Sequence, residues 1–192
     1  MQTVSVIIPT YKNRGGLIGS VESALSQDYE GLIEVIVVDD NDPQSLFRKH
    51  TEELMTQYND NPKIKYIRHD VNKNGAAARN TGLRAAKGDL IAFLDDDDLF
   101  LQGKLTKQVA YLCEHPEFDA VYCHARRGNH VASTAVIEGD GSRDILLLQS
   151  NFFTPSLMFR RESLESIYGF DESFRRHQDY ELLLRFFAAG YK

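Results

Sequence analysis

The sequence predicts an α/β protein with a mostly parallel central sheet and helices on both faces of that sheet. Three observations lead to this fold class. Short runs rich in β-branched residues alternate with amphipathic stretches over the first 120 residues. The runs are continuously apolar, which is typical of strands buried on both faces. Polar residues follow where the runs stop, at the edge where an open α/β sheet binds its ligands.

Four segments are predicted as strands, and the stretches after them have the periodicity of amphipathic helices. The strands are expected at 4–9, 33–40, 64–69 and 90–95. The helices are expected at 15–26, 43–58, 74–88 and 102–114. Asp42 and Pro43 are expected to open the second helix, and Gly88 is expected to close the third.

Beyond residue 120 the alternation of strand-like and helix-like segments is less regular. Segments 119–125 and 130–137 are expected to form a hairpin or edge strands, and 156–164 is expected to run from a strand into a helix. Segment 178–190 reads as a closing amphipathic helix. Because no Pro- or Gly-rich linker marks a boundary, we predict a single domain over residues 1–192. The chain stops just after a helix and its glycine, which we interpret as a truncation point.

The composition of the chain limits the classes of partner that it can bind. The 192 residues carry a formal net charge of -6, which argues against nucleic acid or an anionic membrane bound through a basic surface. A nucleotide remains compatible, because a metal ion can supply positive charge locally. Cys113 and Cys123 form no CxxC pair, which fits a reducing cytoplasm. The first residues do not resemble a signal peptide, and no apolar run approaches the ~20 residues of a membrane span. We therefore expect a cytoplasmic protein, with peripheral membrane contact left open.

The segment LIAFLDDDDLF, residues 90–100, sets four aspartates against the end of a buried strand. Adjacent carboxylates about 5 Å apart repel by roughly 3 kcal/mol per pair at an effective dielectric near 20. The segment starting at Asp95 does not match a calcium EF-hand loop, because Phe100 and Thr106 occupy the positions that require glycine and glutamate. The sequence also lacks a dinucleotide fingerprint, a GxxxxGK[ST] loop and an HExxH motif.

The remaining use of the aspartates is to bind a hard divalent cation. One or two carboxylates would hold the ion, and substrate phosphates would complete its coordination. Asp95 and Asp97 would point the same way in an extended segment. The alternative is an acidic turn exposed to solvent.

Five segments in order then resemble the family 2 inverting glycosyltransferases of the bacterial surface-polysaccharide type, which have the GT-A fold. They are SVIIPTY (5–11), VIVVDDN (35–41), NGAAARNTGLRAAKGDLIAFLDDDD (74–98), GFDESF (169–174) and QDYELLLR (178–185). The resemblance implies a nucleotide-sugar donor, usually a uridine diphosphate sugar, and Mn²⁺ or Mg²⁺. It also implies a nucleotide-sugar-binding half over 1–124 and an acceptor-side half over 125–192.

The same resemblance assigns donor-binding residues. Thr10 and Tyr11 would flank the uracil, with Tyr11 stacked on it, and Asp40 would accept the uracil N3–H while Asp39 supports the loop. Arg79 would reach the nucleotide from the start of a helix. The alternatives are edge packing for Tyr11, a helix-capping turn for the two aspartates and a solvent-facing position for Arg79.

The D-x-D motif of the family falls on Asp95 and Asp97. Asp97 would bind the metal, Asp95 would bind the ribose or a metal-bound water, and Asp96 would assist. Asp98 leaves the register ambiguous by one residue. The general base of the family falls on Asp179, with Gln178 in place of the usual glutamate; the alternative is that Asp179 only caps its helix. His177 either contacts the diphosphate or metal or is a surface histidine.

These residues predict a metal-dependent single displacement onto a glycan or a lipid-linked sugar acceptor. Two alternatives stay open. One is a sugar-phosphate nucleotidyltransferase, for which PTYKNRGG (9–16) is a poor version of the activating loop. The other is a nucleotide-sugar-binding module without catalysis. The sequence does not determine the donor sugar, the linkage or the oligomeric state.

Overall fold

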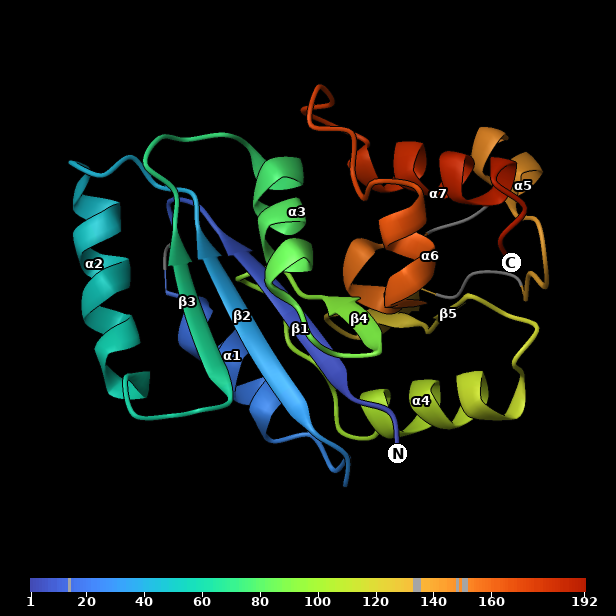
Figure 1. Ribbon diagram of the computed structural model, residues 1–192, viewed down its shortest axis with the longest axis horizontal. Coiled ribbons are helices and arrows are strands. Elements are labelled where there is room, and N and C mark those ends of the chain that lie inside the picture. The colour runs from blue at the N-terminus through green and yellow to red at the C-terminus, as the bar shows by residue number, and fades with distance from the viewer. Residues whose placement is uncertain (14, 133–135, 148, 150–151) are drawn as a thin grey trace.

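The computed structural model describes residues 1–13, 15–132, 136–147, 149 and 152–192. Its centre is a six-stranded sheet in the order β3-β2-β1-β4-β8-β5 (Figure 1). The first four of these strands are parallel: β3 (Ile64–Arg68), β2 (Ile33–Asp39), β1 (Val4–Thr10) and β4 (Leu90–Phe93). β8 (Leu157–Arg160) pairs antiparallel with β4, and β5 (Ala120–Tyr122) pairs antiparallel with β8. The predicted α/β class with a mostly parallel sheet is confirmed.

Helices cover both faces of the sheet because successive strand residues point to opposite sides. In β1, Val4, Val6 and Ile8 pack into one core, and Ile7 packs into the other. The first core is completed by α1 (Leu17–Leu25) and α4 (Lys104–Glu114). The second is completed by α3 (Gly75–Ala85), α6 (Arg161–Ser166) and α7 (Gln178–Ala188). In Figure 1, α3 lies in front of the sheet and α1 behind it.

Two predicted helix ends are wrong. α2 (Leu46–Met55) begins after Ser45, whose hydroxyl accepts a hydrogen bond from Arg48 N, rather than at Asp42 and Pro43. Asp42 and Pro43 instead lie in a turn closed by Ser45 N and Asp42 O at 3.0 Å. A short 3₁₀ turn, η1 (Thr56–Tyr58), follows α2.

Gly88 does not cap α3, which ends at Ala85. It is needed for close packing, since a Cβ there would lie 2.6 Å from Ser5 N. The start of the helix is capped by Asn74, whose side chain accepts a hydrogen bond from Ala77 N.

The segments beyond residue 120 divide between the sheet and a hairpin. β5 joins the main sheet, whereas β6 (Ala125–Arg127) and β7 (His130–Ala132) form a separate antiparallel pair. Residues 133–135 of the predicted segment 130–137 lie outside the described residues. A helix α5 (Ser142–Leu146) and a 3₁₀ turn η2 (Thr154–Ser156) precede β8, which runs directly into α6 as predicted.

The carboxyl ends of β1 and β2 lie side by side, since Thr10 pairs with Asp39 at the end of the register. β4 lies on the other side of β1, so the Asp95–Asp98 segment reaches the same edge. The topology therefore gathers the polar residues that the sequence places after the strands. Within the described residues, no helix has both the length and the apolar character needed to cross a membrane.

Candidate active site

Two cavities meet at the aspartates that follow β4. Cavity A has a volume of about 530 Å³ and cavity B about 540 Å³. The two cavities share Asp95 and Asp97. Most predicted donor-binding residues line cavity A: Thr10, Tyr11, Asp40, Arg79 and Asp95 to Asp97. Asp179 lines cavity B together with Asp98. The predicted donor-binding residues and the predicted base thus face adjoining spaces that share Asp95 and Asp97.

The Asp95–Asp98 segment forms a turn rather than the extended chain assumed from the sequence. Asp98 N donates a hydrogen bond to Asp95 O at 3.1 Å. The side chains therefore take different partners. Asp95 Oδ1 pairs with Arg79 Nη2 at 2.7 Å, and Asp96 Oδ2 accepts from Thr10 Oγ1 at 2.5 Å. Asp97 is exposed.

The backbone of this turn is held by the loop after β1 and by α1. Asn13 Nδ2 donates to Asp96 O at 2.9 Å, and Ser20 Oγ donates to Asp98 O at 2.8 Å. Gly16 lies so close that a Cβ there would be 2.5 Å from Asp96 O. These supports were not predicted from the sequence, although the glycine pair before α1 is a signal of close backbone approach.

The acidic turn is electrostatically strained. Burial raises the pKa of the Asp96 carboxyl, and the nearby charges of Asp97 and Asp95 raise it further. Hydrogen bonds from Thr10 and Asn13 lower the same pKa. Burial is also the main cause that raises the pKa of Asp98, and repulsion from Asp95 and Asp97 adds to it. The charge of Arg127 lowers this pKa. A bound cation would relieve this repulsion.

The available ligands suit one kind of metal site. Among the described residues, no group of three or more His, Cys, Asp or Glu side chains converges on a single point, so a site built from protein ligands alone is absent there. Asp97 and the second oxygen of Asp95 have no hydrogen-bond donor in the described part of the chain. Mg²⁺ and Mn²⁺ are commonly held by one or two carboxylates and completed by substrate phosphates. The residues present fit that arrangement.

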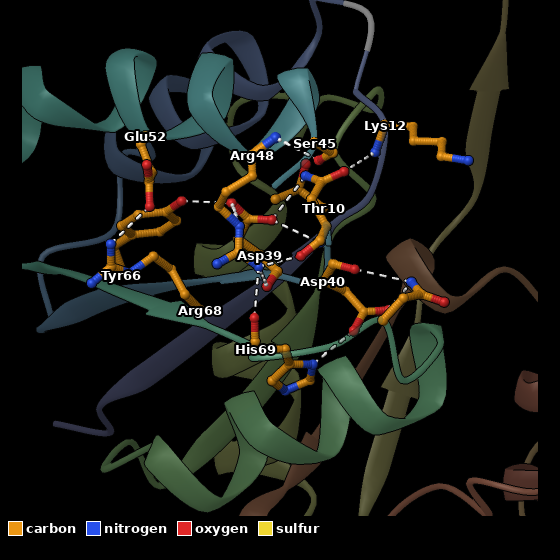
Figure 2. Close-up of polar contacts among 12 residues, drawn as sticks. Thr10, Lys12, Asp39, Asp40, Ser45, Arg48, Glu52, Tyr66, Arg68 and His69 are labelled. Carbon is orange, nitrogen blue, oxygen red and sulfur yellow. Dashed lines mark hydrogen bonds and ion pairs between the residues drawn. The ribbon is translucent and has the colours of Figure 1, made fainter. Parts of the chain in front are cut away.

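Asp39 is fully buried and does not line cavity A; Figure 2 shows its side chain among its polar partners, near Arg48 and Tyr66. Its Oδ2 lies 3.0 Å from Arg48 Nε and accepts a hydrogen bond from Tyr66 Oη at 2.6 Å. Burial and this hydrogen bond raise the pKa of the Tyr66 phenol. Arg48 Nη2 also donates to His69 O at 2.8 Å. Asp39 is placed to support the loops around the cavity, not to contact a ligand directly.

Asp40 lines cavity A, but protein donors already occupy its carboxylate. Oδ1 is bonded to His69 Nδ1 at 2.7 Å and Lys73 N at 2.8 Å. Oδ2 accepts from Asn72 Nδ2 at 2.7 Å and Asn74 N at 2.9 Å. A carboxylate offers about four lone-pair sites, so the N–H group of a nucleotide base would have to replace one of these four hydrogen-bond donors. This network could not be predicted from the sequence, because its donors come from the segment that follows β3.

Tyr11 stands at the rim of cavity A and is 44% exposed. The Lys12 ammonium lies 4.9 Å from the centre of its ring. Lys12 adopts a left-handed φ of 52° and donates its backbone N–H to Asn41 Oδ1 at 2.8 Å. This contact ties the loop after β1 to the loop after β2 and sets the position of the aromatic ring.

Arg79 points into the junction between the cavities, so the solvent-facing alternative is wrong. Its side chain is only 13% exposed. Besides the ion pair with Asp95, Nη1 donates to Gln178 Oε1 at 2.9 Å, and the guanidinium lies 5.6 Å from the Phe170 ring centre. Within the described residues its buried Nε has no hydrogen-bond partner.

Asp179 is the second residue of α7, and the N-cap position is taken by His177. Asp179 is therefore not the N-cap residue, although its carboxylate still bonds a backbone N–H in the first turn of α7. Its Oδ1 accepts a hydrogen bond from Tyr180 N at 3.1 Å, and no cation of the described residues lies within 4.0 Å of it. Its carboxylate is half-buried and lines cavity B.

His177 lies outside the described lining of both cavities, and its exposed ring stacks near Tyr180 with ring centres 5.9 Å apart. Arg175, which the sequence analysis missed, lines cavity A. The adjacent arginines in FRRHQD were the available signal for a cationic residue near the site.

Comparison with known proteins fits this geometry. The family model for glycosyl transferase family 2 matches residues 5–181. The chain therefore belongs to glycosyl transferase family 2. It is 37% identical over 112 residues, 58% of this chain and 42% of the relative, to the UDP-Glc:alpha-D-GlcNAc-diphosphoundecaprenol beta-1,3-glucosyltransferase WfaP of Escherichia coli.

Two solved structures share the fold. The complex of S. aureus TarS 1-349 with UDP-GlcNAc superposes with a TM-score of 0.77 at 24% identity, covering 96% of this chain and 53% of that one. The mannosyltransferase PcManGT of Pyrobaculum calidifontis, in complex with GDP-Man and Mn²⁺, gives 0.74 at 23% identity, covering 98% and 53%. The fold is thus the GT-A fold. This chain spans between 42% and 53% of the length of these three proteins.

Proposed function

We propose that this chain transfers a sugar, with inversion at the anomeric carbon, from a uridine diphosphate sugar to a hydroxyl group of a growing glycan or lipid-linked sugar. The observation that carries the proposal is the junction of the two cavities. Cavity A holds the residues suited to a nucleotide diphosphate, and cavity B holds Asp179, whose carboxylate has no ion-pair partner in the described chain. Asp95 and Asp97 line both spaces.

In the donor half, Tyr11 offers an exposed ring at the rim for stacking on the base, and the Arg79 guanidinium offers positive charge to the diphosphate. Thr10 and Asp96 hold each other and fix the turn beneath the diphosphate. Asp40 holds residues 72–74 of the loop before α3 through hydrogen bonds. It reaches the base when the base N–H replaces one of its four present donors. Asp39 acts only through the loops that it supports.

Mn²⁺ or Mg²⁺ would be held by Asp97, with the second oxygen of Asp95 as the other protein ligand. When bound, such an ion supplies positive charge that stabilises the departing diphosphate. PcManGT, whose structure contains Mn²⁺, has the same fold and supports this proposal.

The chemistry on the acceptor side belongs to Asp179. The acceptor oxygen forms the new bond to the anomeric carbon as the bond to the diphosphate oxygen breaks, and the hydroxyl proton passes to the Asp179 carboxylate. The nucleoside diphosphate leaves with the electron pair of the broken bond. Positive charge develops on the sugar ring in this transition state, as in other glycosyl chemistry. The fold holds donor and acceptor in fixed orientation, which lowers the entropic part of the barrier.

The test is a calorimetric titration with UDP-glucose, UDP-GlcNAc and GDP-mannose, with and without Mn²⁺, beside an assay for release of nucleoside diphosphate. We expect tight binding of a uridine donor only with metal, and a product of inverted configuration by NMR. Pyrophosphate release from UTP and a sugar 1-phosphate would instead establish the nucleotidyltransferase. Donor binding without transfer to any glycan or lipid-linked acceptor would establish a binding module.

A further inference from the structure

Cavity B is lined by side chains of both charges. Four are carboxylates, Asp95, Asp97, Asp98 and Asp179, and three are cations, Lys104, Arg126 and Arg127, which we call the basic wall. An acceptor that is a neutral sugar needs a base and hydroxyl-binding groups, but it gives no reason for three cations in the same space. The basic wall is therefore a feature that the proposed transfer step does not use.

Lys104 is the most informative of the three cations. It is the first residue of α4 and is half-buried; its ammonium donates to Gln108 Oε1 and lies 4.3 Å from the Phe100 ring centre. No carboxylate of the described residues comes within 4.0 Å of it. Burial lowers the pKa of this ammonium to about 8, with only Cys123 acting in the opposite direction. A cation desolvated in this way gains stability from a bound anion.

The two arginines extend the basic wall along the β6–β7 hairpin. The Arg127 guanidinium lies 4.5 Å from the Phe153 ring centre, which orients it. It lowers the pKa of Asp98 through space but forms no ion pair with it within 4.0 Å. Arg126 Nε donates to Gly128 O at 2.9 Å. In the described chain neither arginine forms an ion pair with a carboxylate. Arginine side chains held in this state suit phosphate oxygens, which match their fork of N–H donors.

We propose that Lys104, Arg126 and Arg127 form a phosphate-binding subsite for the acceptor, which carries a phosphate or diphosphate ester beside the hydroxyl that Asp179 deprotonates. The subsite rests on the proposed function, since it assigns the acceptor to cavity B. Leu99 and Leu101 also line this cavity and are 62% and 61% exposed. They suit an aliphatic chain attached to the phosphate.

The test uses geranyl diphosphate and inorganic diphosphate as probes. Each is titrated by calorimetry into the protein saturated with UDP and Mn²⁺, so that the donor site is already filled. Wild type is compared with Lys104→Met and Arg127→Gln. The matched controls are Lys107→Met, an exposed lysine of the same helix, and Arg68→Gln, an exposed arginine on β3. Circular dichroism melting checks that each variant is folded.

We expect both probes to bind wild type, with geranyl diphosphate the tighter. Lys104→Met and Arg127→Gln should each weaken binding at least tenfold, whereas the two controls and the affinity for UDP with Mn²⁺ stay within twofold. Equal binding by wild type and both variants would overturn the subsite. Weakened UDP affinity in Lys104→Met would overturn it too, because the cations would then serve the donor diphosphate. Failure of wild type to bind UDP with Mn²⁺ would count against the proposed function itself.

Discussion

Gln178 Oε1 accepts a hydrogen bond from Arg79 Nη1 at 2.9 Å, although the two residues are 99 positions apart. The same guanidinium pairs with Asp95 Oδ1 at 2.7 Å, and Gln178 directly precedes Asp179. A continuous chain of contacts therefore runs from the proposed metal site through the donor cavity to the proposed base. Gly75 leaves room for it, since a Cβ there would lie 3.1 Å from Arg79 Nη1.

This contact predicts a role for Gln178 in positioning. Gln178→Ala should lower donor affinity about tenfold, because a hydrogen bond to a charged group contributes roughly 1.5–3 kcal/mol. Gln178→Glu should retain donor affinity within about threefold, since a carboxylate also accepts from Arg79. Calorimetry with a UDP-sugar and Mn²⁺ measures both. Unchanged affinity in the alanine variant would show that Arg79 holds its position without Gln178.

Asp179→Asn should reduce transfer by about 10²–10⁴-fold, the range ascribed to general acid–base catalysis, because the amide cannot take the hydroxyl proton. Donor affinity should change by no more than a few-fold, since Asp179 lines cavity B and not cavity A. Steady-state kinetics and donor titration together give the result. Parallel loss of both would make Asp179 a structural residue.

Asp97→Asn should abolish the stabilisation that Mn²⁺ and UDP together give in a thermal melt, because the exposed carboxylate is the proposed metal ligand. Asp98→Asn serves as the control in the same turn and should retain most of the shift in Tm. The reverse outcome would move the metal register by one residue.

The buried pair of Asp39 and Arg48 predicts a large effect on stability. Arg48→Met leaves the Asp39 carboxylate buried without its cation, which costs about 3–5 kcal/mol in the free energy of unfolding. Arg68→Met removes the exposed pair with Glu52 and should cost no more than about 1 kcal/mol. Urea unfolding followed by circular dichroism compares the two. Similar losses in both variants would contradict the buried role.

Lys104 predicts a pH dependence of stability. Its pKa is about 8 in the folded protein and 10.5 ordinarily, so between these values the unfolded chain binds more protons. Stability should therefore rise with pH across this window relative to Lys104→Met, whereas below pH 8 the desolvation cost is fully present. Urea unfolding at pH 7, 8, 9 and 10 gives the difference. A flat difference would show that the Lys104 ammonium is well solvated.

Several features followed from the sequence because neighbouring residues determine them. Apolar runs and helical periodicity predicted the strands of the parallel part and most helices. The order of the strands in the chain also placed Asp95 to Asp98 at the ligand-binding edge. The helix boundaries were predicted less well. Ser45 caps α2 in place of Asp42, because Asp42 lies in a turn and the Ser45 hydroxyl accepts the hydrogen bond that begins the helix.

By itself, then, the sequence determined the α/β class, the position of the acidic segment and the family resemblance. Tertiary structure alone decided which of these side chains face a ligand. Asp39 turns inward to Arg48, and Arg79 turns into the junction beside Gln178. The Asp40 carboxylate already accepts hydrogen bonds from His69 and from residues 72–74. The reason is that periodicity reports the geometry of neighbours along the chain, whereas these partners come from distant segments that meet only when the sheet and helices pack.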